Sequence, residues 1–128
     1  MKKKILLIED DLPTIDIYKT TLNKSGFEVE ALDLGAKALE KIEAMKEKKA
    51  EKPDLVLLDL ILPDMNGIKI LEKIKKEEET KDIPVFILTN YTDEELRKMG
   101  YSLKSEQYFL KANFTLSRLV KEVRKRLK

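Results

Sequence analysis

The segment Pro53-Asp54-Leu55-Val56-Leu57-Leu58-Asp59 decides the fold. Its central residues are four consecutive aliphatics between a helix-breaking proline and an acid, a pattern typical of a parallel strand buried on both faces. A second run of the same kind, Ile5-Leu6-Leu7-Ile8, leads directly into Glu9-Asp10-Asp11. Because parallel strands need long crossover connections, which are usually helices, these two runs predict an α/β fold.

Strand-length and helix-length segments alternate through the rest of the chain. Apolar runs and apolar alternation predict five strands, at residues 5–8, 27–32, 55–58, 83–88 and 107–110. Apolar residues at helical spacing predict a helix after each strand. The predicted helix starts are Asp11, Asp33 and the capping box Thr92-Asp93-Glu94-Glu95. We therefore expect a parallel sheet with helices on both faces.

The composition fits a single globular domain over residues 1–128. The chain has no Cys and no His, which excludes disulfides, thiolate metal sites and imidazole bases. Its apolar runs are too short for a membrane span or a signal peptide, so we expect a soluble, cytoplasmic protein that does not act at a membrane.

The charge is unevenly distributed along the chain. Residues 111–128 contain seven Lys or Arg and one Glu, which makes the last predicted helix basic on its polar side. We interpret this side first as a solvated face and second as a surface for an acidic protein. Nucleic acid comes last, because the net charge of the whole chain is only +2.

Polar and charged residues stand at the ends of four predicted strands. Ligands of open α/β sheets bind at the carboxyl ends of the strands, so these positions are the ones to inspect for a site. We expect three acids, a hydroxyl and an ammonium to meet at this edge of the sheet: Glu9, Asp10, Asp59, Thr89 and Lys111.

This set of groups predicts a magnesium site. Placing Asp59 near Glu9 and Asp10 raises at least one carboxyl pKa by like-charge repulsion, and a cation would relieve that repulsion. Mg²⁺ suits a few hard oxygen ligands better than Ca²⁺ or zinc does, and Mn²⁺ is a possible substitute. The backbone carbonyl of Ile61 could complete the protein ligands. A carboxylate held in this way can attack phosphorus and form an acyl phosphate, whose oxygens Lys111 and Thr89 could stabilise.

The motifs together resemble the receiver domain of two-component response regulators, of the single-domain chemotaxis and sporulation type, over essentially the whole chain. The matching features are Ile5-Leu6-Leu7-Ile8-Glu9-Asp10-Asp11, the segment from Pro53 to Asp59, the following Leu62-Pro63-Asp64-Met65-Asn66-Gly67, Thr89 after an apolar strand, and Tyr108 three residues before Lys111.

The resemblance implies a doubly wound, flavodoxin-like sheet of five strands in the order 2-1-3-4-5. It also implies transfer of a phosphoryl group to Asp59 from a sensor histidine kinase or phosphotransfer protein, with Glu9 and Asp10 as the acidic metal pair and Lys111 as the family's lysine. Thr89 and Tyr108 would switch a protein-docking face made of the fourth helix, fifth strand and fifth helix, for an unknown partner. A signalling domain of this kind, a monomer or weak dimer, catalyses only its own phosphorylation and dephosphorylation.

The chain departs from the family pattern beside the predicted site. Ala112 follows Lys111 where the family usually has a proline joined by a cis peptide bond. A cis bond before alanine costs about 2.5–4 kcal/mol, so we expect a trans bond. Asn90 stands where the family usually has a small residue, and Tyr91 is bulky beside the expected entry path. We expect both to slow arrival of the phosphoryl group or hydrolysis of the acyl phosphate.

Two alternative functions are open at this point. A haloacid-dehalogenase-like phosphatase also uses an aspartyl phosphate and Mg²⁺, but it needs Asp-x-Asp after its first strand, where this chain has Glu9-Asp10-Asp11. A designed or degenerate flavodoxin-like scaffold without phosphorylation would account for the helices rich in Lys and Glu. It would not account for carboxylates converging at one edge of the sheet.

Overall fold

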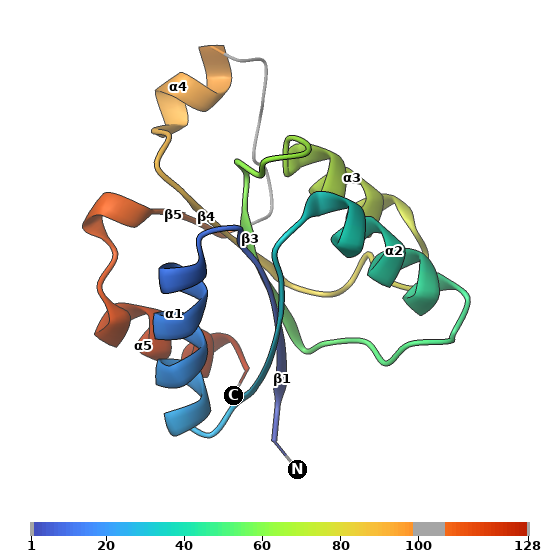
Figure 1. Cartoon of the computed structure of the whole chain (residues 1–128), viewed down its shortest axis with the longest axis horizontal. Helices are drawn as coiled ribbons and strands as arrows, with labels where there is room; N and C mark the ends of the chain where they lie inside the picture. Colours follow the sequence, from blue (N-terminus) through green and yellow to red (C-terminus); the bar gives the residue numbers. More distant parts are fainter. Residues whose placement is uncertain (1, 99–106, 128) are drawn as a thin grey trace.

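The fold is a five-stranded parallel sheet with helices on both faces (Figure 1). The computed structural model describes residues 2–98 and 107–127. Within them the strands run in the order β2-β1-β3-β4-β5, which confirms the predicted fold class and strand order. The strands are β1 Lys4–Ile8, β2 Glu28–Leu32, β3 Leu55–Asp59, β4 Val85–Thr89 and β5 Gln107–Leu110. The helices are α1 Leu12–Lys24, α2 Gly35–Lys46, α3 Ile68–Lys76, α4 Asp93–Lys98 and α5 Leu116–Arg126, with a 3₁₀ turn at Lys111–Asn113.

The helices cover the two faces in pairs. Helices α1 and α5 lie on one face and α2 and α3 on the other, and both described chain ends lie at the end of the sheet opposite α4 (Figure 1). Helix α4 adds Leu96 to the core on the α2 and α3 face. Among the described residues, no helix is both long enough and apolar enough to cross a membrane.

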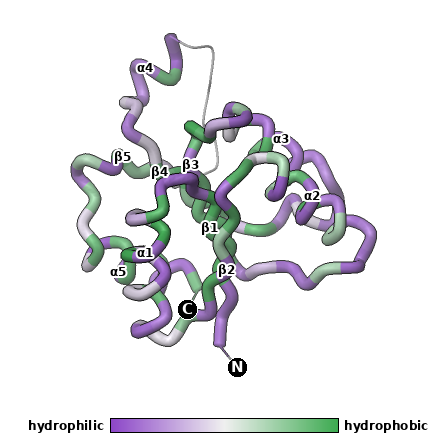
Figure 2. The backbone as a smooth tube through the Cα atoms, in the orientation of Figure 1, coloured by the Kyte–Doolittle hydropathy of each residue, from purple (hydrophilic) through white to green (hydrophobic). Residues whose placement is uncertain are grey.

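Alternate residues of the strands enter two separate cores. In β3, Val56 and Leu58 pack toward α2 and α3, whereas Leu55 and Leu57 pack toward α1 and α5. Figure 2 shows apolar stretches in the central strands, which lie between helices that carry both hydrophilic and hydrophobic stretches. This two-sided burial explains why the central strands are continuous apolar runs rather than alternating ones.

Most of the predicted helix starts are confirmed. Asp11 caps α1 by accepting a hydrogen bond from Thr14 N–H at 3.1 Å. The capping box also forms, since Glu95 N–H donates to Thr92 Oγ1 at 3.1 Å and Thr92 N–H donates to Glu95 Oε1 at 3.0 Å. Both interactions satisfy backbone donors that a helix start leaves unpaired.

The predicted cap of α2 is wrong. The residue at the N-cap position is Leu34, and Asp33 instead pairs with Lys37 at 2.8 Å across one helical turn. Asp64, from the loop after β3, accepts the hydrogen bonds that Asp33 was expected to accept. The physical reason is that the Asp64 carboxylate already accepts from the free N–H groups of the first turn, so Asp33 is not needed as the cap.

The strand register sets the edge at which the site forms. Asp59 is paired with Leu88 across β3 and β4, and Thr89 is paired with Leu110 across β4 and β5. Lys111 comes directly after Leu110, so the register places it close to Thr89 at the same edge of the sheet. Strand β4 begins at Val85, two residues later than predicted; Pro84, which has no N–H to donate, accepts from Val56 N–H at 3.0 Å through its carbonyl.

Candidate functional site

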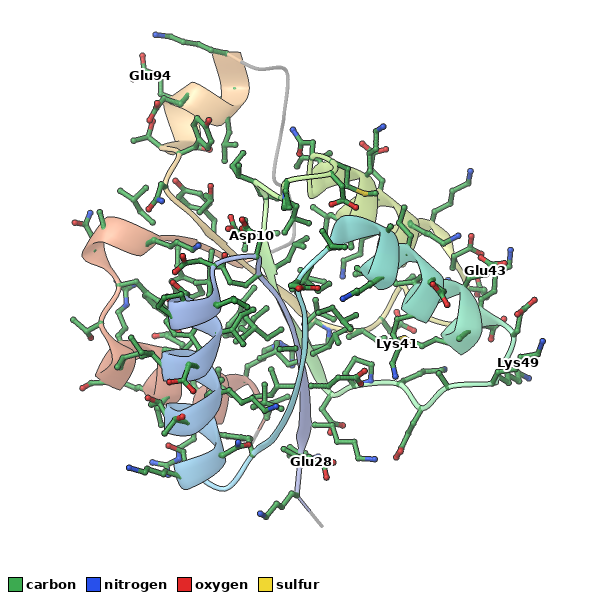
Figure 3. All side chains as sticks on the ribbon, viewed as in Figure 1. Asp10, Glu28, Lys41, Glu43, Lys49 and Glu94 are labelled. Carbon is green, nitrogen blue, oxygen red and sulfur yellow. The ribbon has the colours of Figure 1, made fainter. Side chains whose placement is uncertain are left out.

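Three carboxylates gather at the carboxyl ends of β1 and β3. One oxygen each from Glu9, Asp10 and Asp59 lies within 4.8 Å of the others, so the three form a group that could hold a metal ion. Glu9 and Asp59 are buried and Asp10 is exposed. Figure 3 shows Asp10 at the end of the sheet opposite Glu28, the first residue of β2. The structure thus brings together the three acids that the sequence predicted.

The Glu9 side chain is folded back onto its own loop. Its Oε2 accepts from the N–H groups of Asp10 and Asp11, at 3.0 and 3.2 Å, and its Oε1 accepts from the Lys111 ammonium. The Glu9 backbone is also fixed, because its N–H donates to the Leu32 carbonyl at 3.0 Å. Burial raises the pKa of Glu9, and the nearby Asp59 charge adds to this effect against the opposing influence of Lys111.

Lys111 joins the carboxyl ends of β1, β3 and β5 through its ammonium group. Its Nζ donates to Asp59 Oδ2 at 3.0 Å and forms an ion pair with Glu9. Burial alone would lower the pKa of Lys111, but the hydrogen bonds and charges of Glu9 and Asp59 outweigh it and raise the pKa above that of an ordinary lysine. Lys111 therefore remains protonated beside the two buried acids.

The charges at this edge do not balance. Within the group of Glu9, Asp10, Asp59 and Lys111, three carboxylates and one ammonium leave an excess of negative charge, which a divalent cation such as Mg²⁺ would offset. An open pocket of about 590 Å³ lies over the group, lined by the acids, Lys111, Asn90 and Tyr91, among others. Ile61 also lines this pocket, and its N–H donates to Asp59 Oδ1 at 3.2 Å. The site can thus admit a cation, its water ligands and a phosphoryl group.

The family model of the response regulator receiver domain matches residues 5–124. The chain belongs to this family. It is 35% identical over 112 residues to the phosphate regulon transcriptional regulatory protein PhoB of Escherichia coli. The aligned residues cover 87% of this chain and 46% of PhoB. It is 31% identical over 111 residues to the alkaline phosphatase synthesis transcriptional regulatory protein PhoP of Bacillus subtilis, covering 87% and 43%. The chain spans about half the length of these relatives.

A solved structure supports the same assignment. The phosphorylated cyanobacterial phytochrome response regulator RcpA superposes with a TM-score of 0.79 at 32% identity, over 98% of this chain and 91% of RcpA. The chain is therefore a receiver domain of two-component response regulators. Neither the phosphatase nor the unphosphorylated scaffold is favoured by these comparisons.

In this receiver domain Thr89 and Tyr108 are connected through the backbone of Tyr91. Tyr91 N–H donates to Thr89 Oγ1 at 3.2 Å, and the Tyr108 hydroxyl donates to the Tyr91 carbonyl. Thr89 is fully buried and Tyr108 is half-buried against the core on the α2 and α3 face. The sequence indicated Thr89 and Tyr108 but not the residue between them, because a link through backbone atoms leaves no mark in side-chain chemistry.

The Lys111 backbone is held by an aromatic stack. The Lys111–Ala112 peptide bond is trans, as predicted. Phe114 N–H donates to the Lys111 carbonyl at 3.2 Å, and its ring lies 4.4 Å from that of Phe109. The Arg118 guanidinium lies 5.5 Å from the centres of both rings. In this receiver domain the turn after Lys111 thus has a trans peptide bond and is supported by these contacts.

Asp64 is a site-loop residue to which the sequence assigned no role of its own. Its hydrogen bonds from Ala36 and Gly35 N–H hold the pKa of the Asp64 carboxyl below its ordinary value. The one signal in the sequence was negative: Leu34, just before α2, has no side-chain oxygen with which to cap a helix. The Leu34 side chain cannot cap the helix, but nothing in the sequence points to Asp64 in place of Asp33 as the residue that does.

Proposed function

We propose that this receiver domain accepts a phosphoryl group on Asp59 from a phosphohistidine of a sensor kinase or phosphotransfer protein. One observation carries the proposal: the Asp59 carboxylate is buried at the end of β3, 3.0 Å from the Lys111 ammonium and within 4.8 Å of two further carboxylates. Burying a carboxylate beside other acids costs folding free energy, which is unexpected unless the group has a function. Its surroundings suit a nucleophile more than a structural acid.

The residues at the site fit Mg²⁺. Glu9, Asp10 and Asp59 would supply carboxylate oxygens and Ile61 its carbonyl oxygen, all of them hard ligands. When bound, the ion supplies positive charge that neutralises the phosphoryl oxygens and the clustered acids. Mn²⁺ has similar ligand preferences and should substitute for it.

The transfer itself needs few protein groups. An Asp59 oxygen forms a bond to phosphorus as the bond from phosphorus to the donor histidine nitrogen breaks, which leaves an acyl phosphate and a free imidazole. Lys111 is placed to stabilise the negative charge on the phosphoryl oxygens as they move, and its raised pKa keeps it charged. No general base is required for this transfer.

Phosphorylation should depend strictly on a divalent ion. We expect the protein to gain the mass of one phosphoryl group when it is incubated with acetyl phosphate and Mg²⁺, because the ion offsets the excess negative charge of the site. In the presence of a chelator the gain should fall at least tenfold. Intact-protein mass spectrometry measures both, and an equal gain with and without Mg²⁺ would contradict the proposed role of the metal.

We further propose that Thr89 and Tyr108 carry the signal to a docking face formed by α4, β5 and α5. A phosphoryl group that recruits the Thr89 hydroxyl would compete with the hydrogen bond from Tyr91 N–H, and the Tyr91 carbonyl is bonded to Tyr108. The backbone of residue 91 is thus the physical link from the site to the start of α4. We expect both partners of the domain, the phosphoryl donor and the downstream effector, to be proteins.

Removing the Tyr108 hydroxyl should weaken this response without blocking the chemistry. We expect Tyr108→Phe to be phosphorylated like the parent and to lose about 1 kcal/mol or less of unfolding free energy, the usual value of one hydrogen bond. Hydrogen exchange of residues 89–98 should change less on phosphorylation than in the parent. The control is Tyr18→Phe, which alters a half-buried tyrosine on the opposite face. Identical exchange changes in parent and Tyr108→Phe would exclude the role of Tyr108.

A further inference from the structure

The loop between β3 and α3, residues 60–67, is fastened to the start of α2 by one carboxylate. Asp64 Oδ1 accepts from Gly35 N–H and Asp64 Oδ2 accepts from Ala36 N–H, both at 2.8 Å. These N–H groups belong to the first turn of α2, where the helix has no partners of its own for them. The contact joins segments 28 and 29 residues apart in the sequence.

Gly35 allows this loop to lie directly against the helix. A Cβ atom at residue 35 would come within 2.6 Å of Met65 Sδ, and closer still to Met65 Cγ. Met65 in turn packs against the core beneath α2 and α3. The cap and the glycine therefore act together: the cap holds the loop tip against α2, and a Cβ at residue 35 would displace the Met65 side chain from its place there.

The base of the same loop is held together by backbone contacts and lies directly against Asp59. Ile61 and Asn66 form an antiparallel bridge, and Gly67 N–H donates to the Leu60 carbonyl at 2.6 Å. A Cβ at Gly67 would lie 2.6 Å from the Asp59 carbonyl oxygen, so base and site are in direct backbone contact. Displacement of the tip at Asp64 would be passed to Ile61 and Asp59 through this narrow hairpin.

We infer that Asp64 is a positioning residue for the metal side of the site, a role that rests on the proposed function and extends it. Ile61, the proposed carbonyl ligand, is 43% exposed and lies three residues before Asp64, so core packing holds it only weakly. The cap orders the loop before the ion arrives, which reduces the conformational entropy lost on binding. A residue that touches no ligand thereby sets the affinity for the metal.

The test is calorimetric titration of Mg²⁺ into the whole chain and four variants. We expect Asp64→Ala to raise the Kd for Mg²⁺ by about tenfold, a typical effect of losing a group that orients metal ligands. Gly35→Ala should also raise the Kd, although it changes no charge and introduces the best helix former. The matched control is Asp33→Ala, which removes an equivalent charge near the start of α2 from a residue that forms an ion pair with Lys37. Its Kd should stay within twofold of the parent.

The outcomes are distinguishable. A parent that binds no Mg²⁺ overturns the proposed function, and this inference with it. If the parent binds but Asp64→Ala binds equally well, the cap only stabilises α2 and the positioning role is wrong, even if the melting temperature falls. If Asp33→Ala weakens binding as much as Asp64→Ala, lost charge explains the effect and the inference also fails. Asp64→Asn, which retains one acceptor oxygen, should recover part of the affinity.

Discussion

Asparagine at position 59 is expected to abolish phosphorylation and leave the domain folded. In the parent, Ile61 N–H donates to Asp59 Oδ1 at 3.2 Å and the Lys111 ammonium donates to Asp59 Oδ2 at 3.0 Å. The amide oxygen of Asp59→Asn can still accept one of these hydrogen bonds. The amide cannot form an acyl phosphate, and its loss of charge reduces the repulsion with Glu9 and Asp10. After treatment with acetyl phosphate and Mg²⁺, the intact mass should therefore be unchanged, while the circular dichroism spectrum matches that of the parent.

The control for this variant lies just before the same strand. Asp54 precedes β3 at the opposite end of the sheet, where its Oδ2 accepts from Lys4 N–H at 2.7 Å. Asp54→Asn makes the same chemical change outside the site and should gain the phosphoryl mass to the same extent as the parent. An equal gain by Asp59→Asn and the parent would show that the acceptor is another residue.

Truncation of Lys111 should cause the largest loss of stability. Its side chain is 17% exposed, and its two partners are more buried still, with Glu9 at 3% and Asp59 at 9%. Lys111→Ala leaves these buried acids without their counter-ion, a change that costs about 3 kcal/mol or more of unfolding free energy. Urea denaturation at neutral pH without metal measures the loss. Millimolar Mg²⁺ should restore part of it, since the ion would supply the missing positive charge.

Lys73→Ala is the matched control for Lys111→Ala. Lys73 pairs with Glu43 at 2.9 Å, but these side chains are 27% and 45% exposed, so water screens the pair. Exposed ion pairs contribute about 1 kcal/mol or less, and Lys73→Ala should cost no more than that. If Lys111→Ala were equally mild, the buried acids would not depend on Lys111 as their counter-ion.

The sequence predicts the fold well because buried parallel strands have a recognisable residue pattern. Leu55 to Leu58 is buried on both faces and is therefore continuous, and the edge strand β2 alternates because its alternate residues face solvent. Once the strands are placed, parallel topology alone brings Asp59, Thr89 and Lys111 to one edge. The clustering of the candidate site thus follows from strand ends and requires no side-chain detail.

The contacts that the sequence did not predict all join distant segments or use backbone atoms. Capping rules scan neighbouring residues, so they chose Asp33 and overlooked Asp64, which reaches α2 only after the chain has crossed the sheet. The Tyr91 link between Thr89 and Tyr108 uses a peptide N–H and carbonyl that every residue has. The 3₁₀ turn and aromatic stack behind Lys111 depend on tertiary packing around Phe114, which no local pattern encodes.

The most direct measurement is the identity of the residue that carries the phosphoryl group. Borohydride reduces an acyl phosphate to an alcohol and leaves free carboxylates intact, so it converts a phosphorylated aspartate to homoserine. Tandem mass spectrometry of the digested protein, after phosphorylation with Mg²⁺ and reduction, should find homoserine at position 59. Homoserine at Asp10, Asp54 or any other aspartate instead, or at no position, would contradict the account.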